Sequence, residues 1–404
     1  MNVYVRDLTR EFARRGIQVD VFTRQQGLCD PHSVSELGQG SRVIHVTAGP
    51  TTPLSGPAHL PFLESFTSEV QSLVAEEGLR YDLVHSHYWL SGLVARELKA
   101  AWNGLPVVHM FHTLGLMKNR TARSESEREP SVRIEGERQV MAFADRIVAS
   151  TPAEHAQLQW LYGANPDKIA IIPPGVDVNR FHPMAREEAR QRIQVPAADS
   201  LILYVGRIEP LKGIDTLLQA IGILRAGCPD DAPCLYLAII GGDPDDPDRE
   251  NAEMERLKQM RVELGIEEVV TFLGSREQEA LPFYYSAADV VVVPSHYESF
   301  GMVALEAMAC GTPVIASEVG GLAFLVRDGE TGYRVEDQNV SALAGKLSLL
   351  LEDLELRERL GQQAANYAQG FAWPHIADRL LALFNEAIRG HPAPAGTSVS
   401  RAPM

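Results

Sequence analysis

Along the chain, short apolar runs alternate with longer segments whose apolar positions recur at helical spacing. Ten of the short runs predict buried strands, at residues 19–23, 82–87, 107–112, 146–150, 168–172, 201–206, 234–241, 269–273, 290–294 and 312–316. Helical patterns separate most of them, for example at residues 214–225 and 250–264. Strands and helices that alternate in this way predict an α/β protein with parallel, doubly wound sheets covered on both faces.

The alternation is interrupted once, at residues 173–183 (PPGVDVNRFHP). Two prolines and a glycine end the preceding strand, and no new strand pattern begins before Leu201. We therefore expect two Rossmann-like domains, the first over residues 1–180 and the second over residues 181–372.

The two ends of the chain add further expectations. Residues 373–389 predict a final amphipathic helix, and residues 390–404 have the composition of a disordered tail. A doubly wound domain normally opens with a strand and a Gly-rich turn. This chain opens with a helical pattern in which Val3, Leu8 and Phe12 share one face. The first domain is thus expected to lack its first strand and Gly-rich turn.

Composition narrows the class of protein. A net charge of −16 over 404 residues argues against a nucleic-acid partner, which would require a basic surface. No run reaches the roughly 18 apolar residues of a membrane span, and the start has no apolar signal core. The cysteines show no CxxC spacing, which predicts reduced structural thiols and a cytoplasmic protein; they are Cys29, Cys228, Cys234 and Cys310.

The strongest chemical signal is ESFGMVALEAMACGTPVIAS, residues 298–317. It predicts a loop at the carboxyl end of a strand, followed by a helix over about residues 300–310, and ligands of open α/β sheets bind at that edge. Backbone N–H groups at the start of the helix would suit a diphosphate. Glu298 and Glu306 lie eight residues apart, about two helical turns, and could accept hydrogen bonds from sugar and ribose hydroxyls.

A second signal is YVGRIEPLKGID, residues 204–215. A strand ends at Gly206 and a helix begins near Gly213, which leaves Arg207 and Lys212 in the turn between them. Two fixed cations at a strand-to-helix turn suit a leaving diphosphate, whose negative charge grows as a glycosidic bond breaks.

Together, GRxxxxKG and the E-x7-E of ESFGxxxxEAMACGTPVIAS resemble the retaining GT-B glycosyltransferases of family 4, over nearly the whole chain. The resemblance implies a transferase whose second domain holds a nucleotide-sugar and whose first domain holds the acceptor. It implies that Arg207 and Lys212 hold the diphosphate, that Glu298 contacts the donor sugar and that Glu306 contacts the ribose. The other implied donor-binding residues are Arg276 in the base pocket and Ser299, Phe300, Gly301 and Met302.

The motifs of the first half resemble a narrower group. MNVYVRDL, HSHYWLSG (residues 85–92) and HMFHTLGLMKN (residues 109–119) are similar to the D-inositol 3-phosphate glycosyltransferases of mycothiol synthesis. These enzymes transfer GlcNAc from UDP-GlcNAc. The resemblance implies that His112 lies near the donor sugar and takes part in catalysis. It also implies that the acceptor phosphate is surrounded by Asn2, Tyr88, Thr113 and Arg133.

Metal sites receive little support from the residues. We expect His85 and His87 to point to opposite faces of their strand and infer no metal role for them. The resemblance implies that a magnesium ion can be held, mostly by main chain, near Tyr285, Ser286 and Ala288.

Two departures from the narrower group keep alternatives open. Its members carry a lysine for the acceptor phosphate in the stretch that corresponds to residues 54–61 (LSGPAHLP), and this chain has none there. The acceptor could therefore be a sugar phosphate, as in sucrose-phosphate synthases. A first domain without its first strand and Gly-rich turn could also leave a non-catalytic nucleotide-sugar-binding protein. The absence of GxGxxG after a strand weighs against a dehydrogenase, and a homodimer is a further expectation.

Overall fold

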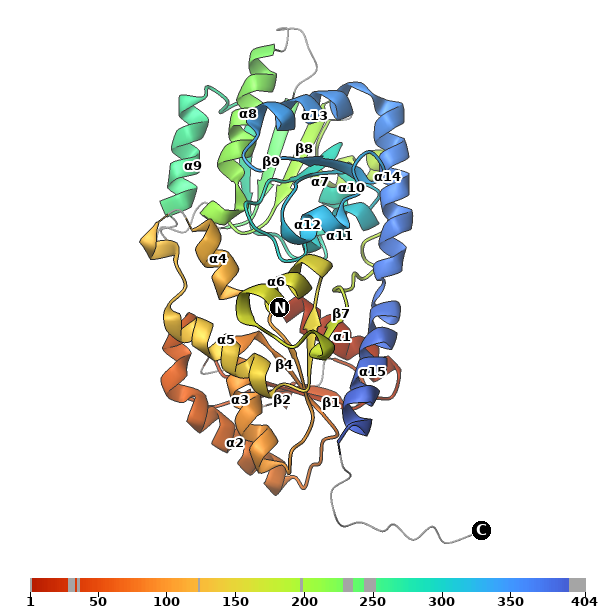
Figure 1. The fold of residues 1–404 in the computed structure, drawn as a ribbon. Coiled ribbons are helices and arrows are strands. Elements are labelled where there is room, and N and C mark those ends of the chain that lie inside the picture. The colour runs from red at the N-terminus through yellow and green to blue at the C-terminus, as the bar shows by residue number, and fades with distance from the viewer. Residues whose placement is uncertain are drawn as a thin grey trace, which may run out of the picture.

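The computed structural model describes residues 2–27, 33–34, 37–122, 124–196, 199–227, 235–242 and 252–391. They form two lobes stacked along one axis (Figure 1). The first lobe contains α1 (Asn2–Arg14), β1 (Val19–Arg24), β2 (Ser33–Val34), β3 (Ser41–Val46), α2 (Leu63–Glu76), β4 (Val84–His87), α3 (Tyr88–Ala101), β5 (Val107–Met110), α4 (Gly115–Thr121), α5 (Ser131–Phe143), β6 (Arg146–Ala149), α6 (Pro152–Tyr162) and β7 (Ile169–Ile171).

The strands of the first lobe form two separate sheets, ordered β1-β3-β2 and β4-β5-β6-β7. Apart from the short antiparallel strand β2, all of their pairings are parallel. Within the described residues, β1 and β4 are each paired on one side only. The described part of the first lobe opens on helix α1, and its parallel strands with intervening helices agree with the expected Rossmann-like domain.

The second lobe is built on one parallel six-stranded sheet, ordered β10-β9-β8-β11-β12-β13. Its elements are α7 (Arg186–Ile193), β8 (Ser200–Val205), α8 (Ile214–Gly227), β9 (Leu235–Ile240), α9 (Ala252–Glu263), β10 (Val270–Gly274), α10 (Leu281–Ala287), β11 (Val290–Val293), α11 (Met302–Ala309), β12 (Val314–Ser317), α12 (Gly320–Leu325), β13 (Gly332–Val335), α13 (Val340–Glu352) and α14 (Leu354–Ala368). This is the doubly wound strand order.

Alternation along the central strands explains why both faces of this sheet are covered. Leu201 and Leu203 pack in one apolar cluster with α11 and α14, whereas Ile202 and Tyr204 pack in another with α8 and α13. Successive side chains of a strand point to opposite faces, so a continuous apolar run such as β8 requires helices on both.

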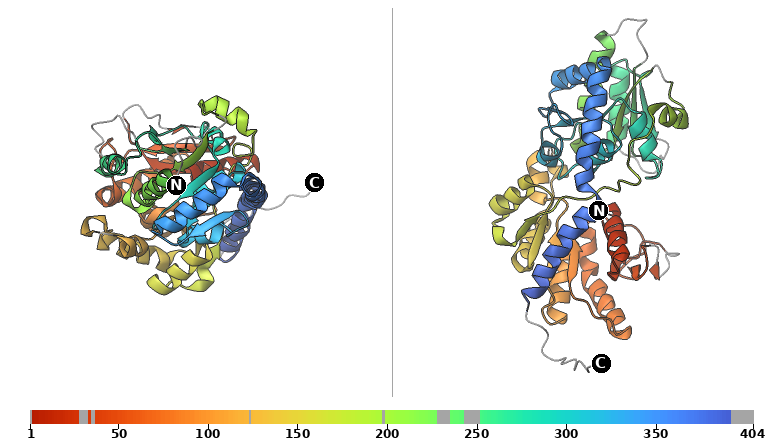
Figure 2. Two further views of the ribbon diagram at one scale, coloured as in Figure 1. Left: turned by 90° about the horizontal axis from the view of Figure 1, so that it is seen from above. Right: turned by 90° about the vertical axis from the view of Figure 1, so that its right-hand side faces the viewer.

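The chain returns to the first lobe at its end. Helix α14 lies along the second lobe, and α15 (Trp373–Arg389) continues down the same side onto the first lobe (Figure 2). Trp373, Ile376 and Leu380 of α15 share an apolar cluster with Tyr4 and Leu8 of α1. The expected final helix therefore has its predicted bounds and packs against the helix that opens the chain.

Three strands were missed by the sequence analysis, namely β2, β3 and β13. Burial in β3 follows the pattern buried, partial, partial, buried, partial, buried, which resembles neither a continuous apolar run nor strict alternation. Strand β13 contains Gly332 and Arg334 and forms the edge of its sheet. Residues 392–404 of the predicted tail and Cys29, Cys228 and Cys234 lie outside the described residues, while Cys310 is a buried free thiol. No helix in the described part of the chain is both long and apolar enough to cross a membrane.

Candidate active site

The donor-side candidates lie where the strand order of the second lobe reverses. Strands β8 and β11 are neighbours in the sheet, although β9 and β10 separate them in the sequence. Arg207 and Lys212 follow β8, and Glu298 follows β11. The crevice at the carboxyl ends of two such strands is the usual ligand site of a doubly wound sheet.

Both cations of the first loop are paired with carboxylates. The ammonium Nζ of Lys212 lies 2.6 Å from Oε2 of Glu298, and both side chains are largely buried. Arg207 lies 2.7 Å from Glu209, but its side chain remains 72% exposed. Lys212 is therefore fixed on Glu298, whereas Arg207 extends from the surface and is free to reorient toward an anion.

The two loops are held together by backbone contacts. The N–H of His296 donates to the carbonyl of Leu211 at 2.9 Å. Gly213 has φ +63°, and a Cβ there would lie 2.0 Å from the carbonyl oxygen of Pro294. Only a glycine fits this close approach, which places Lys212 beside the loop that carries Glu298.

A further pair of glycines shapes the loop that contains Ser299 and Phe300. Gly301 has φ +107° and caps α11, which begins at Met302 and not at the predicted Phe300. The N–H of Gly321 donates to the carbonyl of Glu298 at 2.9 Å, and a Cβ on Gly321 would lie 2.3 Å from Cα of Phe300. The start of α12 therefore supports this loop from behind, a role that the sequence analysis did not assign.

Glu306 lies within α11 and is 8% exposed. The hydroxyl of Tyr285 donates to its Oε2 at 2.9 Å. Burial raises the pKa of Glu306 to about 7, with a further increase from the charge of Asp7 in α1 and an opposing effect of the hydrogen bond. Glu306 is thus a buried carboxyl that is hydrogen-bonded within its own lobe and is affected by the charge of Asp7 on the opening helix.

Arg276 follows β10, which lies at the edge of the sheet two strands away from β8. Its side chain is exposed and donates to the hydroxyl of Tyr284 at 3.2 Å and to the carbonyl of Ser275 at 3.0 Å. Neither contact links Arg276 to Glu298 or Glu306. Arg276 therefore lies apart from the other residues predicted to bind the donor.

On the first-lobe side, Tyr88 and His112 both have a left-handed backbone, with φ +71° and +63°. Bulky residues rarely adopt this conformation, and such strain concentrates at functional sites. A hydrogen bond of 2.9 Å joins Nδ1 of His87 to Nε2 of His112, and the ring of Tyr4 meets both imidazoles edge-on. Burial lowers the pKa of His112 to about 3, so this pair is neutral at physiological pH.

The expectation that His85 and His87 point to opposite faces is wrong. Their ring centroids lie 4.1 Å apart, because residues two positions apart in a strand share a face. Within the described ranges, however, no group of three or more His, Cys, Asp or Glu side chains could hold a metal ion.

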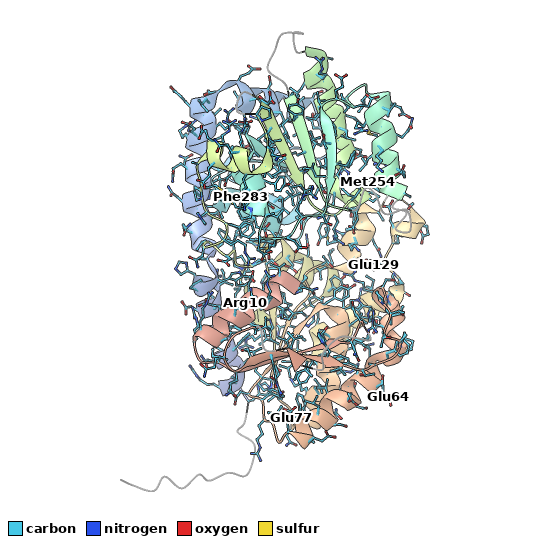
Figure 3. All side chains as sticks on the ribbon, turned by 180° about the vertical axis from the view of Figure 1, so that it is seen from behind. Arg10, Glu64, Glu77, Glu129, Met254 and Phe283 are labelled. Atoms are coloured by element: carbon cyan, nitrogen blue, oxygen red, sulfur yellow. The ribbon has the colours of Figure 1, made fainter. Side chains whose placement is uncertain are left out.

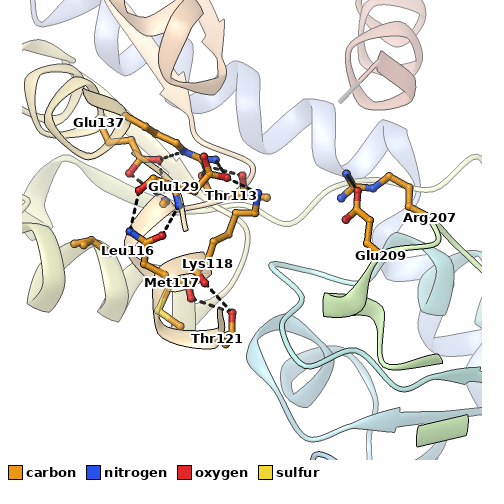
Figure 4. A network of polar contacts seen from close by, with 12 residues as sticks. Thr113, Leu116, Met117, Lys118, Thr121, Glu129, Glu137, Arg207 and Glu209 are labelled. Atoms are coloured by element: carbon orange, nitrogen blue, oxygen red, sulfur yellow. Dashed lines mark hydrogen bonds and ion pairs between the residues drawn. The ribbon is translucent and has the colours of Figure 1, made fainter. Parts of the chain in front are cut away.

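Arg133 is fully buried and contacts Thr113, Glu129 and Glu137, which are labelled in the polar network of Figure 4. It donates to the hydroxyl of Thr113 at 2.9 Å and from Nε to Glu137 at 2.9 Å, and its guanidinium lies 5.0 Å from the centre of the Tyr88 ring. Three of the four predicted acceptor-side residues therefore meet in one place. Glu129 also pairs with Arg133, at 2.8 Å.

Asn2, the fourth acceptor-side residue, is exposed at the start of α1. Arg6 on the same helix donates to Gln278 of the second lobe, as does Arg180, the latter at 2.7 Å. The beginning of α1 thus lies at the junction of the lobes, where Figure 2 places the N-terminus.

Tyr297 connects the two halves of the site. It precedes Glu298 in the second lobe, and the backbone of Leu114 in the first lobe is close enough to its hydroxyl to lower the pKa of Tyr297 against the effect of burial. Burial raises the pKa of Tyr297, and the charges of Arg133 and Glu298 both act on it. The donor-side and acceptor-side candidates therefore face one another across the junction.

Sequence reasoning missed Tyr297, Glu129 and Glu137. Nothing in the local pattern distinguishes these residues from ordinary surface residues, because their importance comes from contacts with residues distant in the sequence. Tyr297 stands directly before ESFG, which was the one signal available.

Comparison with known proteins agrees with this geometry. Residues 1–180 match the family described as Glycosyltransferase Family 4, and residues 185–367 match Glycosyl transferases group 1. The D-inositol 3-phosphate glycosyltransferase of Thermomonospora curvata is 41% identical over 394 residues, 96% of this chain and 90% of the relative. That of Actinosynnema mirum is 43% identical over 389 residues, 96% of this chain and 92% of the relative.

Solved structures show the same architecture. A sucrose-phosphate synthase from Thermosynechococcus elongatus has a TM-score of 0.87 at 35% identity, covering 96% of this chain and 94% of that one. Anabaena HepE in complex with UDP and glucose has a TM-score of 0.75 at 21% identity, covering 95% of each chain, and supports the fold alone. With its two Rossmann-like lobes, this chain belongs to the family 4 glycosyltransferases of the GT-B fold.

Proposed function

We propose that the protein transfers a sugar, with retention of anomeric configuration, from a UDP-sugar to a hydroxyl of D-inositol 3-phosphate. GlcNAc is the donor sugar that the sequence resemblance implies. The observation that carries the proposal is the meeting of two sites at one junction. The Lys212–Glu298 pair and the Arg133 network both lie near Tyr297, because the charges of Glu298 and Arg133 act on its hydroxyl.

The donor would lie on the second lobe (residues 181–372). Arg207 and Lys212 would hold the diphosphate, Glu298 would accept hydrogen bonds from the sugar and Glu306 from the ribose. The loop of Ser299, Phe300 and Gly301, with the start of α11 at Met302, would border the diphosphate, and Arg276 the base. Support comes from the strand reversal at β8 and β11 and from the pairing of Lys212 with Glu298.

The acceptor would lie on the first lobe (residues 1–180), with its phosphate near Arg133, Thr113, Tyr88 and Asn2. The close relatives named for D-inositol 3-phosphate, which match nearly the full chain, support this choice. The sucrose-phosphate synthase likeness keeps a sugar phosphate as the second candidate.

In the proposed reaction, the bond between the anomeric carbon and the diphosphate oxygen breaks, and its electron pair leaves with UDP. The acceptor oxygen attacks the same face of the sugar, and its proton passes to the leaving phosphate. Arg207 and Lys212 stabilise the charge that develops on that phosphate. His112, which is neutral, orients the sugar by hydrogen bonding and carries no net charge into the reaction.

The main chain around Tyr285, Ser286 and Ala288, which the resemblance implies as a magnesium site, is partly engaged in hydrogen bonds. The carbonyl of Tyr285 accepts from the hydroxyl of Thr312 at 2.6 Å, and the carbonyl of Ala287, between Ser286 and Ala288, accepts from Nε of Arg190 at 3.0 Å. The guanidinium of Arg190 is a positive charge beside this main chain, which disfavours a divalent cation at the turn.

The test is UDP release from UDP-GlcNAc and from UDP-glucose, with D-inositol 3-phosphate, fructose 6-phosphate or no acceptor. Release stimulated by D-inositol 3-phosphate, together with a product of matching mass, is expected. Stimulation by the hexose phosphate alone would favour the second candidate. UDP binding without turnover would identify a nucleotide-sugar-binding protein, and sedimentation of the same sample would test the expected homodimer.

A further inference from the structure

Two cations of the first lobe converge on a single carboxylate oxygen. Nζ of Lys118, in α4, donates to Oε1 of Glu129, and Nη1 of Arg133, in α5, lies 2.8 Å from the same oxygen. Burial acts to raise the pKa of Glu129, but the hydrogen bond from Lys118 and the charge of Arg133 outweigh it and leave the pKa below its ordinary value. Glu129 is therefore an anion clamped between two positive groups.

The other carboxylate on Arg133 is of a different kind. Glu137 is fully buried and accepts hydrogen bonds from Nε of Arg133 at 2.9 Å, from the N–H of Gly115 at 3.0 Å and from the hydroxyl of Tyr162. These partners belong to three separate elements, and they leave Glu137 no room to move. Glu137 therefore fixes the orientation of the guanidinium permanently.

Glu129, in contrast, stands at the edge of open space. Its side chain is 15% exposed and that of Lys118 is 32% exposed. A cavity of about 780 Å³ is bordered by Glu129 and by Asn119, Glu125, Arg128 and Ser131. In Figure 3, Glu129 lies at the level where the two lobes meet. Lys118 and Arg133 do not border this cavity, so Glu129 is the member of the trio that faces it, and its carboxylate has room to rotate outward.

We propose that Lys118 and Arg133 form the anion site for the phosphate of the acceptor, and that the Glu129 carboxylate occupies that site until the phosphate displaces it. This inference rests on the proposed function and adds to it a second phosphate-binding cation and a place-holding anion. A phosphate monoester carries a charge of about −1.5 to −2 at pH 7, against −1 for a carboxylate. It competes effectively for two convergent cations, and an uncharged polyol does not.

The place-holder also accounts for specificity. Without Glu129, Lys118 and Arg133 would attract any small anion. With Glu129 present, a ligand binds only if it interacts with the two cations more strongly than the Glu129 carboxylate does. Residues 54–61 contain no lysine, so Lys118 supplies from α4 the second positive charge that Arg133 requires for a dianion.

The first experiment uses Lys118→Met in the full-length chain. We expect the KM for D-inositol 3-phosphate to rise about 10- to 100-fold, as for the loss of one charge-assisted hydrogen bond, while the KM for UDP-GlcNAc stays within twofold. Lys118→Arg should recover most of this loss because it restores the charge. An unchanged acceptor KM in Lys118→Met would overturn the role of Lys118.

The second experiment uses Glu129→Gln, which keeps the shape and removes the competing charge. Inorganic phosphate, titrated calorimetrically into the UDP-bound protein, should bind about three- to tenfold more tightly than to the wild type, as expected for the loss of one competing ion pair. Weaker or equal binding would show that Glu129 is not a place-holder. Arg128→Met and Glu125→Gln are matched controls, since these residues border the same cavity and pair only at 3.3 Å on its exposed side.

The two readouts separate this inference from the proposed function. If D-inositol 3-phosphate is not a substrate but inorganic phosphate binds more tightly to Glu129→Gln and more weakly to Lys118→Met than to the wild type, the anion site stands and the acceptor must be another phosphate ester. If transfer proceeds and neither variant alters acceptor KM or phosphate binding, the function stands and the anion site is rejected.

Discussion

Lys212 and Glu298 form an ion pair of 2.6 Å between two loops that are 86 residues apart in the sequence. The pair exists because β8 and β11 are adjacent in the sheet and their carboxyl ends open into the same crevice. It places a cation for the leaving phosphate directly beside an acceptor for sugar hydroxyls.

Lys212→Met is expected to reduce kcat by about 10²- to 10³-fold, because the cation stabilises charge that grows in the transition state. Glu298→Gln should reduce kcat/KM for the donor by roughly 10- to 100-fold through the loss of a charged hydrogen-bond acceptor. UDP release under saturating acceptor measures both. Glu209→Gln, which alters the exposed partner of Arg207, is the control and should change kcat less than about threefold.

His87 is expected to position His112 through the hydrogen bond between their rings. His87→Leu removes this bond and should lower kcat about 10- to 100-fold, because a small displacement of a group at the reacting centre is costly. His87→Asn should restore much of the activity, since its side-chain amide can donate or accept near the position of Nδ1. Equal losses in both variants would indicate a packing role only.

His85→Leu is the matched control, because Nε2 of His85 is buried without a hydrogen-bond partner. The variant should retain nearly the full kcat. Since burial lowers the pKa of His112 to about 3, the profile of kcat between pH 5 and 8 should show no inflection from this residue.

Glu306 should couple stability to pH. Its pKa rises from 4.5 in the unfolded chain to about 7 in the fold, so the folded carboxyl binds a proton more tightly. A carboxyl whose pKa is raised by folding stabilises the fold while it is protonated. The contribution of Glu306 to the free energy of unfolding is therefore full below about pH 4.5 and is lost as pH rises through about 7. Glu306→Gln removes this dependence, which denaturant unfolding at several pH values would detect against wild type.

The same group should release protons when UDP binds, because hydrogen bonds from ribose hydroxyls favour the ionised form. Calorimetry at pH 6.5 in buffers of different ionisation enthalpy should show fractional proton release for the wild type and none for Glu306→Gln. Identical release in both would remove Glu306 from the nucleotide site.

Gly321→Ala is expected to damage the donor site without contacting a ligand. The added Cβ would lie 2.3 Å from Cα of Phe300 and 2.4 Å from the carbonyl of Ser299, so the loop must shift. We expect destabilisation of about 1–3 kcal/mol and at least tenfold weaker UDP binding. Gly345→Ala, in α13 with open space around it, should instead be neutral or stabilising by about 0.5–1 kcal/mol.

Much of the fold followed from the sequence, because the continuous apolar runs of β8 and β11 are the pattern of buried parallel strands. The opening and closing helices, α1 and α15, were also predictable from their apolar faces. Strands β3 and β13 were not, because their half-buried patterns hold too few apolar residues to stand out. The face shared by His85 and His87 was predictable from the period of a strand and was assigned wrongly.

By itself, the sequence determined which residues could perform the chemistry. The sequence shows three local features directly: glycines that permit close backbone approach, cations at a strand-to-helix turn, and two carboxylates on either side of FG. Only the tertiary structure decided which of them meet. Lys212 reaches Glu298, Arg133 reaches Thr113, and Glu129 bridges Lys118 and Arg133, because strand order and helix packing bring distant segments together. Contacts of this kind depend on the whole fold, and no local pattern specifies them.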